Sequence, residues 1–402
     1  MFNVITKLAV GGAQETALSY CSQLDPDRWA MTLVTGPELS PEGDLFEEAR
    51  RRGVPVLTVP SLRRRIRPLA DTRAVLELVR LFRQERPDIV HTHSSKAGLV
   101  GRLAARIAGV PVVVHTVHGW SFHDGMSPVA RTVAVTLERL AARWTWPLVV
   151  VAEIDAEIGV AAGIGQPAQY RVVRSAVDVD RLRRAAGSRA SARAALGIPE
   201  GVPVAGTVTR LCRQKDPETL LRAARLTAEL QPDARFVVVG DGPLRPQVER
   251  LLDELDLRDH VTLLGRRSDV EALLPGFDAF VLSSRWEGLP RVVVEAMAVG
   301  VPVVSTDVGG IAEAVEDQVS GLLVPPGDAV ALGNALVRVL GQPGLGARLA
   351  ATAASRVDEF DIGTMTDSLD DLYSGLLAGG RSRPRRRRIA AAVRTASGHE
   401  AA

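Results

Sequence analysis

Cysteine is almost absent from this chain, which has only two among its 402 residues, Cys21 and Cys212. The two are far apart in the sequence and match the spacing of neither a zinc site nor a disulfide framework. So few cysteines fit a chain that folds in a reducing compartment. We therefore expect a cytoplasmic protein.

The sequence also lacks a long hydrophobic run. The nearest candidate, AGVPVVVHTVHGW at residues 108–120, is too short and too polar to span a bilayer. The first residues, MFNVITKLAVGGAQ, place glycines and Gln14 where the apolar core of a signal peptide would lie, so we expect no secretory leader. The first strand pattern looks clipped, which leaves open a start codon further upstream.

Neither sign of charge dominates, and the formal net charge is +2. Residues 381–402 hold seven arginines and one glutamate, so this segment carries +6 and the rest of the chain −4. We expect no nucleic-acid partner for so mildly acidic a body. The segment itself has no apolar period, which predicts a disordered basic tail.

Apolar residues make up 46% of the chain and charged residues 24%, enough for two cores. Short β-branched runs such as FNVIT, DIVHTH, RFVVVGDG and AFVLSS alternate with helical patterns, which indicates parallel sheets covered by helices on both faces. The series breaks over residues 165–200. We predict an α/β fold of two doubly wound, Rossmann-like domains facing each other across a ligand-binding cleft. The predicted boundaries are 1–170 and 171–365 for the domains, 366–378 for a C-terminal helix and 379–402 for the tail.

Glycines open the first loop at a predicted strand end. Gly11 and Gly12 precede a helical pattern, so the backbone could approach a ligand and the helix N–H groups could bind an anion. A plain tight turn explains the pair equally well. The segment lacks the GxGxxG spacing of a dinucleotide site.

Polar side chains follow apolar strands in the segments 88–98 and 113–124, and we expect them at or near the cleft. They are His93, Ser94, Ser95, Lys96, His118, Trp120 and His123. The histidines at 91, 93, 115 and 118 also suggest a metal site, but no third ligand is indicated and Asp124 is the one nearby carboxylate. We favour hydrogen bonding to a polar substrate.

Two cations follow a later strand pattern. Arg210 and Lys215 lie between that strand and a helix, where fixed charges and helix N–H groups would suit a diphosphate. Solvated surface charges fit this segment equally well. The next glycine-rich strand end, VVVGDGP, places Asp241 in a turn, and we expect it in the same site.

The stretch RWEGLPRVVVEAMAV at 285–299 carries two glutamates in apolar surroundings, Glu287 and Glu295. A helix is predicted from about Pro290, so the two carboxylates would flank a helix N-terminus that attracts phosphate. Carboxylates accept hydrogen bonds from vicinal hydroxyls. This suits a nucleotide-sugar, with its ribose at Glu295 and its sugar at Glu287. Alternatively, an arginine of the same domain pairs Glu295.

Six motifs in order resemble those of the GT-B glycosyltransferases of family 4: GGAQ, HTHSSKAG, HTVHGW, the 210–215 loop, GDGP and EGLPRVVVEAMAVGVPVV. The resemblance extends to about residue 375 and is highly specific because all six motifs keep their order. It implies a GT-B fold and retaining transfer of a hexose-type sugar from a nucleotide-sugar. The first-domain motifs resemble the branch that assembles polysaccharides and lipid-linked oligosaccharides. This implies a glycan or polyprenyl-linked acceptor in cell-envelope or exopolysaccharide synthesis.

The resemblance also assigns roles in the donor half. Arg210 and Lys215 would hold the diphosphate, Glu295 the ribose, and Glu287 the hydroxyls of the donor sugar. The leaving phosphate would accept the proton of the acceptor on the front face of the sugar. Catalysis then consists of stabilising negative charge on the leaving diphosphate, which fixed cations and helix N–H groups can do.

In the other half, His118 would lie beside the donor sugar near the reacting carbon, and the Gly12 loop close to the phosphates and acceptor. The backbone around Leu289 would face the donor. Two positions depart from the family pattern, Ala176 in place of the usual glycine and Ala152 in place of the usual serine. Both lie near the predicted domain junction. We therefore expect these two substitutions to change the contacts of the hinge and of the acceptor.

We expect no cofactor and no metal. The DxD pairs Asp25/Asp27 and Asp178/Asp180 do not follow strands that end in the predicted cleft. Three other functions stay open. An epimerase of the same fold would release no transferred sugar, and a non-catalytic nucleotide-sugar-binding partner would be expected to lose a charged donor residue. A nicotinamide oxidoreductase is disfavoured by the missing GxGxxG.

Two arginine clusters would suit an anionic membrane surface. The first, at residues 61–73 of the acceptor-side domain, interleaves arginines with apolar residues. Its members are Arg63, Arg64, Arg65, Arg67, Leu62, Ile66 and Leu69. The second is the polybasic run at 381–388. An arginine-rich composition explains such runs equally well, so peripheral attachment at the inner face of the plasma membrane stands beside a purely cytoplasmic location.

Overall fold

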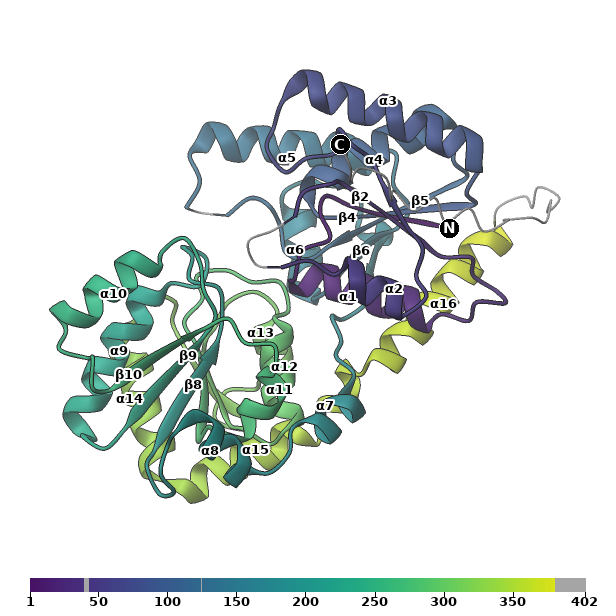
Figure 1. Cartoon of the computed structure of the whole chain (residues 1–402). Coiled ribbons are helices and arrows are strands. Elements are labelled where there is room, and N and C mark those ends of the chain that lie inside the picture. The colour runs from purple at the N-terminus through teal and green to yellow at the C-terminus, as the bar shows by residue number, and fades with distance from the viewer. Residues whose placement is uncertain (40–42, 124, 380–402) are drawn as a thin grey trace, which may run out of the picture.

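The computed structural model describes residues 1–39, 43–123 and 125–379, which form two parallel β-sheets flanked by helices (Figure 1). The strands are β1 Phe2–Ile5, β2 Thr32–Thr35, β3 Val56–Thr58, β4 Ile89–His93, β5 Val112–Val117, β6 Leu148–Val150, β7 Tyr170–Val172, β8 Val204–Val208, β9 Arg235–Val239, β10 Val261–Gly265, β11 Ala279–Leu282, β12 Val303–Thr306 and β13 Gly321–Val324.

The α-helices are α1 Gly12–Gln23, α2 Phe46–Arg51, α3 Pro68–Glu85, α4 Ser95–Ala108, α5 Pro128–Ala142, α6 Glu153–Ala161, α7 Val179–Ala185, α8 Arg189–Leu196, α9 Pro217–Leu230, α10 Arg245–Glu254, α11 Val270–Leu273, α12 Arg291–Ala298, α13 Ile311–Ala314, α14 Ala329–Gly341, α15 Pro343–Ala354 and α16 Ile362–Gly379. Short 3-10 turns are η1 Pro167–Gln169, η2 Leu274–Gly276 and η3 Val357–Phe360.

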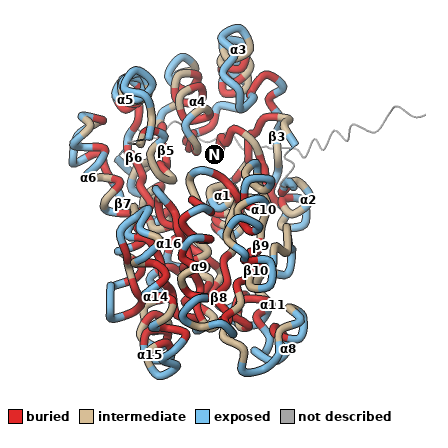
Figure 2. Tube along the Cα trace, turned by 90° about the vertical axis from the view of Figure 1, so that its left-hand side faces the viewer, coloured by how far each residue is buried: buried red, intermediate tan, exposed pale blue. Residues whose placement is uncertain are grey.

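The first sheet has seven strands in the order β3-β2-β1-β4-β5-β6-β7, and all of its strand pairs are parallel. Its central strands β1 and β4 are buried at every position, polar residues included, because helices cover both faces. On one face, α3 and α4 pack through a cluster that includes Leu78 and Ala97. On the other, α1 and α2 pack through a cluster that includes Leu18 and Ala49. Figure 2 shows these buried segments inside exposed helix surfaces.

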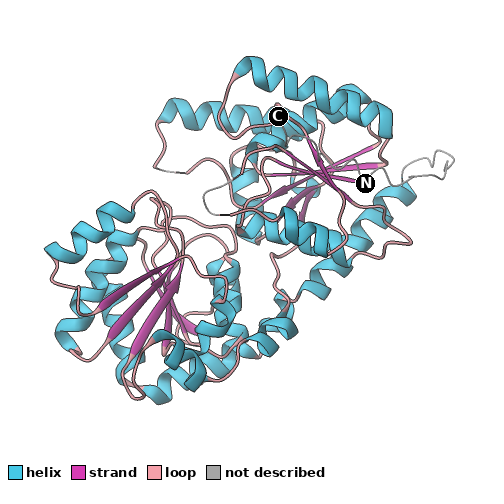
Figure 3. Cartoon of the chain, in the orientation of Figure 1, coloured by secondary structure: helices cyan, strands magenta, loops and turns pink. Residues whose placement is uncertain are grey.

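The second sheet has six parallel strands in the order β10-β9-β8-β11-β12-β13. One face is covered by α9, α10 and α14, which contribute Leu220, Val248 and Leu336 to a single cluster. The other face is covered by α12, with Val293 fully buried. Figure 3 shows each sheet between its helices. The predicted fold of two Rossmann-like α/β domains is confirmed.

The C-terminal helix leaves the second sheet and returns to the first. It begins at Ile362 rather than at residue 366, and its residues Met365, Leu369 and Tyr373 join the cluster around Leu18. Figure 1 shows α16, in yellow, running from the second domain alongside α1 and α2. The helix α16 therefore connects the two domains. It follows the second domain in sequence and packs on the first.

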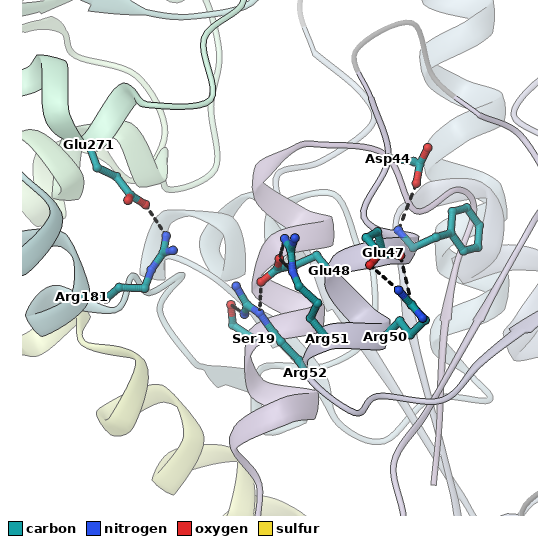
Figure 4. A network of polar contacts seen from close by, with 10 residues as sticks. Ser19, Asp44, Glu47, Glu48, Arg50, Arg51, Arg52, Arg181 and Glu271 are labelled. Atoms are coloured by element: carbon teal, nitrogen blue, oxygen red, sulfur yellow. Dashed lines mark hydrogen bonds and ion pairs between the residues drawn. The ribbon is translucent and has the colours of Figure 1, made fainter.

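Ion pairs hold several short helices in place (Figure 4). Arg52, directly after α2, pairs with Glu48 of that helix over 2.6 Å and reaches the hydroxyl of Ser19 in α1 at 3.3 Å. In the second domain, Arg181 of α7 is ion-paired with Glu271 of α11. Such exposed pairs contribute little stability, so they orient short helices on cores that hydrophobic packing builds.

Two further sequence predictions concern the basic tail and membrane-spanning helices. The basic tail predicted for residues 379–402 lies outside the described residues apart from Gly379. Of the helices that the structure describes, none is long and apolar enough to cross a bilayer.

Candidate active site

The two domains meet at loops that follow the carboxyl ends of β5 and β11. A Cβ atom on Gly288 would come within 3.0 Å of the backbone of His118 and Gly119. A side chain here would need the facing backbone to move back by a few tenths of an ångström, so glycine suits the close approach. Beside this contact, the ring of His123 stacks on Trp286 with 3.9 Å between centroids. The junction thus brings the predicted His118 to the loop that carries the first predicted glutamate.

That glutamate, Glu287, is ion-paired with Lys215. The Ser284 hydroxyl donates to the same carboxylate oxygen over 2.6 Å, and the Gln214 amide lies 3.3 Å from the other oxygen. The pairing follows from topology, because β8 and β11 are neighbours in the sheet and the loops after them lie side by side. Two predicted site residues from distant parts of the chain are therefore in direct contact.

The loop that carries Lys215 is held at several points. Ser283 donates its hydroxyl to the carbonyl oxygens of Lys215 (2.8 Å) and Asp216 (3.0 Å), and Arg285 pairs with the Asp216 carboxylate at 2.9 Å. The 14-residue helix α9 begins directly after this loop. An ammonium group beside a helix N-terminus can bind a phosphate. Arg210 lies on the same loop, at its start.

Asp241 lies in a glycine turn that packs against this loop. A Cβ atom on Gly240 would come within 1.9 Å of the Thr209 carbonyl oxygen, so only glycine fits. The Leu211 N–H donates to the carbonyl oxygen of Asp241 over 3.0 Å. The Asp241 carboxylate accepts the N–H of the next residue at 2.7 Å. Its carboxylate is thus engaged within its own turn, while its backbone positions the segment that carries Arg210.

Glu295 lies inside α12 with its side chain 15% exposed, and burial raises the pKa of its carboxyl group to about 7. The alternative of an arginine partner holds in part. Arg291 places one guanidinium nitrogen 3.8 Å from Glu295, but another lies closer, 3.0 Å, to Glu15 of α1. A Cβ on Gly12 would lie 3.8 Å from the Arg291 side chain. Arg291 thus lies between the Gly12 loop and Glu295 and neutralises the carboxylate only partly.

His118 is oriented by a buried hydrogen-bonded chain. The Tyr20 hydroxyl donates to Asn3 Oδ1 over 2.6 Å, so its oxygen accepts the Nε2 proton of His93 over 2.7 Å. His93 Nδ1, 3.1 Å from His118 Nε2, then accepts the His118 proton. Burial lowers the pKa of His118 to about 4, so the ring is neutral at pH 7. Its Nδ1 is left as an acceptor suited to a hydroxyl group.

Comparison with known proteins decides the family. Residues 11–176 match the glycosyl transferase 4-like domain, and residues 188–356 match glycosyl transferases group 1. The Escherichia coli UDP-Gal:alpha-D-GlcNAc-diphosphoundecaprenol alpha-1,3-galactosyltransferase is 33% identical over 367 residues, which cover 90% of this chain and 94% of that protein. This chain belongs to the group 1 glycosyltransferases of the family 4 type. A D-inositol 3-phosphate glycosyltransferase of Saccharomonospora viridis is 34% identical over 311 residues, covering 73% of this chain and 71% of that protein.

Solved structures show the same fold as this glycosyltransferase. Anabaena HepE in complex with UDP and glucose superimposes with a TM-score of 0.79 at 24% identity, covering 93% of this chain and 99% of that one. Sucrose-phosphate synthase from Thermosynechococcus elongatus gives a TM-score of 0.76 at 23% identity, covering 94% and 99%. The predicted GT-B fold is confirmed.

Some polar residues predicted near the cleft serve the structure of the glycosyltransferase instead. Lys96 pairs with Asp71 at the start of α3 over 2.6 Å. The Trp120 indole donates to a backbone carbonyl of α6 over 2.7 Å and packs in the core beside it. Ser94 and Ser95 form the N-terminus of α4. The predicted residues that reach the domain contact are His118 and His123.

Three of the histidines considered for a metal lie in a row, with ring centroids 4.3 Å apart for His91 and His93 and 5.3 Å apart for His93 and His118. His91 is buried, and its two ring nitrogens hydrogen-bond Tyr373 of α16 at 2.7 Å and Thr116 at 2.6 Å. Burial lowers its pKa to about 3. His115 is also buried and contacts Thr92 at 2.9 Å. Within the described ranges, no group of three or more His, Cys, Asp or Glu side chains is arranged to hold a metal ion.

The two departures from the family pattern lie in packed surroundings. The methyl group of Ala152 would be 2.5 Å from a Cβ on Gly310, whose N–H donates to the Gly288 carbonyl over 2.7 Å. Ala176 is buried in the cluster that includes α16. The Leu289 side chain is buried too, so only the backbone at this position can face a ligand.

Three residues of the junction were not singled out from the sequence: Arg291, Trp286 and Glu313. Glu313 of α13 accepts the N–H of Ile154 at 3.2 Å and pairs with Arg174 at 3.4 Å, which joins the domains on a second side. One signal was available, since Arg291 lies one helical turn before Glu295. The other contacts join residues far apart in sequence, and no local pattern encodes them.

Proposed function

We propose that this glycosyltransferase moves a hexose-type sugar from a nucleoside-diphosphate donor to a glycan or lipid-linked acceptor, with retention of configuration, in cell-envelope or exopolysaccharide synthesis. The observation that carries the proposal is the contact of Lys215 with Glu287 beside His118 at the domain junction. The E. coli relative is named for a UDP-galactose donor and a GlcNAc-diphosphoundecaprenol acceptor. Its similarity over nearly the whole chain supports a UDP-sugar and a polyprenyl-diphosphate-linked sugar as the first substrates to test.

Each site residue has a binding role in this proposal. The diphosphate lies at the N-terminus of α9, where Lys215 and Arg210 supply positive charge. The ribose hydroxyls donate to Glu295 and the sugar hydroxyls to Glu287. The Nδ1 acceptor of His118 receives a further sugar hydroxyl. Asp241, the Gly12 loop and the backbone at Leu289 line the same donor site.

The reaction exchanges one glycosidic bond for another. The bond from the anomeric carbon to the leaving phosphate oxygen breaks, and a bond to the acceptor hydroxyl oxygen forms on the same face of the sugar. The acceptor proton passes to the leaving phosphate. Lys215, Arg210 and the helix N–H groups stabilise the charge that develops there, as preorganised donors do in other sites. No metal or cofactor enters this scheme.

The proposed place of work is the cytoplasm, with peripheral attachment at the inner face of the plasma membrane when the acceptor is lipid-linked. A lipid-linked acceptor keeps its sugar at the bilayer surface, so the enzyme must reach that surface without spanning it. The absence of a membrane-spanning helix among the described residues is compatible with this arrangement.

The test begins with a thermal-shift panel of UDP, GDP, ADP and their hexoses, because a ligand at 100 times its Kd adds about 2.7 kcal/mol of stability. Transfer from the stabilising donor to a polyprenyl-diphosphate GlcNAc analogue is then followed, and the anomeric configuration of the product is read by NMR. We expect an α-linked product from an α-linked donor. An inverted product would overturn the retaining mechanism, and a released epimer without transfer would overturn the function.

A further inference from the structure

The helix α5 carries its large apolar side chains on the outside. Val129, Val133, Leu137 and Leu140 are 75%, 53%, 42% and 43% exposed. Their spacing of four, four and three residues places them along one face of the helix. Isolated exposed apolar residues are ordinary, but a stripe along three turns marks an interaction site.

The inner face of α5 explains why the stripe points outward. It carries Glu138, whose carboxylate is paired with Arg102 of α4 over 2.7 Å, and both side chains are almost fully buried. Small residues, Ala141 and Ala142, fill the remaining contacts. The buried ion pair fixes the rotation of α5 about its axis. Turning the stripe inward would carry Glu138 away and leave Arg102 buried without its partner, which is costly.

The charges beside the stripe are positive. Arg131, Arg139 and Arg143 are exposed, and Glu138 is the only acidic residue between positions 127 and 143. The loop before α3 and the first turn of that helix add a second patch with arginines, in which Ile66 and Leu69 are 86% and 90% exposed. Its arginines are also exposed, at positions 63, 64, 65 and 67.

One sequence expectation is corrected in this second patch. Leu62, expected among the apolar residues interleaved with the arginines, is fully buried in the first core. The exposed apolar residues of the 63–69 loop are therefore Ile66 and Leu69. Helices α3, α4 and α5 lie side by side in one layer (Figure 2), so both patches belong to the helix layer on one side of the first sheet.

We propose that the α5 surface, together with the 63–69 loop of the same helix layer, docks on an anionic lipid bilayer. Aliphatic side chains enter the headgroup region while arginines meet lipid phosphates. Two other partners for this surface would be repelled by its positive charge. A second copy would bring like-charged arginines face to face, and the segment 381–388 of this chain is itself polybasic. The bilayer is the partner that matches an apolar stripe on a helix whose exposed charges are all positive.

The docked orientation has a consequence for the site. The loop that begins after β5 leads from His118 to Ser127, the N-cap of α5, so the membrane-facing helix and the junction are joined by one short segment. The proposal thus deepens the proposed function by naming the surface that delivers a lipid-linked acceptor. It does not depend on that function, since vesicle binding is measured without any transfer.

The experiment is sedimentation of the full chain with vesicles of phosphatidylcholine alone and with phosphatidylglycerol, at low and high salt. We expect salt-sensitive binding to the anionic vesicles. The pair V133S/L137S removes apolar contact without changing charge, and R131Q/R143Q removes charge without changing the stripe. Each should weaken binding at least ~10-fold. V330S, at an exposed valine of α14 in the second domain, is the matched control and should bind as the parent does.

Unchanged melting temperatures and UDP-dependent shifts establish that the variants are folded. Binding that survives both α5 pairs and disappears when the arginines at 385–388 are replaced by serine would overturn the proposal in favour of the tail. Equal binding to neutral and anionic vesicles, or no binding to either, would also overturn it. Loss of vesicle binding with intact transfer to a short-chain acceptor separates this proposal from the catalytic one.

Discussion

The ammonium group of Lys215 is ion-paired with the carboxylate of Glu287, and this pair joins the loop before α9 to the loop before α12. The side chains are only 17% and 7% exposed, so water screens the pair weakly. A diphosphate and a sugar that bind here must draw the two charges apart. The pair therefore connects the proposed phosphate site with the proposed sugar site.

Changing either partner should separate their roles. Lys215→Ala removes charge from the diphosphate site, so we expect weaker UDP binding and at least ~100-fold less transfer. Glu287→Gln keeps the shape and releases Lys215 for the phosphate, so transfer should fall by a similar factor without loss of UDP affinity. Arg210→Ala should behave like Lys215→Ala. Turnover and UDP titrations are measured on each variant.

The control is Arg222→Ala on the exposed face of α9, where the side chain pairs with Glu218 one turn earlier. Its effect should stay within about twofold. Near-normal turnover in any two of the three site variants would contradict the assignment of the donor site.

The pKa of Glu295 predicts a pH effect with a definite sign. Burial favours the protonated carboxyl in the folded state, with a pKa of about 7 against an ordinary 4.5. Folding therefore loses stability as pH rises from about 4.5 to about 7, and ribose binding needs the ionised form that appears at the upper end. At low pH we expect Glu295→Gln and the parent to have nearly the same Kd for UDP. At pH 8 the Kd of the variant should be about ten times that of the parent.

Taking the ratio cancels the titration of UDP itself, whose terminal phosphate also ionises near pH 6. The melting temperature gives a second readout. Relative to the parent, Glu295→Gln should gain stability as pH rises through this window. A ratio that stays at one across the range would refute the ribose role of Glu295.

The strands and the loops of the candidate site could be predicted from the sequence, because short local patterns encode them. The apolar runs predicted the strands, and loops at the carboxyl ends of neighbouring parallel strands must lie together, which placed Lys215 and Glu287 on one edge. The glycines at 119 and 288 carry no such information. Their importance appears only when two loops distant in sequence approach within van der Waals contact.

Periodicity also left the direction of helix faces undecided. The 3.6-residue pattern of α5 shows an apolar face, but the same pattern results whether that face lies inward or outward. The deciding contact is Arg102 with Glu138, on two different helices. The return of α16 to the first sheet is likewise invisible locally, since its apolar residues would suit either core.

The chain from Tyr20 through His93 to His118 predicts a positioning effect. Tyr20→Phe deletes the nearer acceptor of the His93 proton and leaves Asn3 Oδ1 at 3.4 Å, so the tautomer of His118 is held less firmly. We expect turnover to fall about 10- to 100-fold while UDP affinity stays within about twofold. Tyr170→Phe is the control, because its hydroxyl is bonded to the Ile164 carbonyl at 2.6 Å and is buried in the same domain. Equal turnover losses in the two variants would reduce the chain to a structural role.

Metal removal should leave the enzyme active. The DxD carboxylates serve local structure: Asp178 caps α7 by accepting the Arg181 N–H at 2.8 Å, and Asp25 accepts the Asp27 N–H at 2.9 Å. Fixed cations at the α9 loop are proposed to neutralise the diphosphate. Transfer measured after EDTA treatment is expected to match the untreated rate. Activity that EDTA abolishes and Mg²⁺ or Mn²⁺ restores would show that the cations do not suffice.

The buried pair of Arg102 and Glu138 predicts a stability pattern that tests the account of α5. Arg102→Met leaves the Glu138 carboxylate buried without its partner, at a cost of about 3–5 kcal/mol in the free energy of unfolding. Adding Glu138→Leu removes the stranded charge, so the double variant should recover most of that loss. Urea unfolding of the parent, both single variants and the double variant gives the four free energies. If the double variant is as unstable as Arg102→Met alone, the loss comes from the missing contact itself and not from a stranded Glu138 charge.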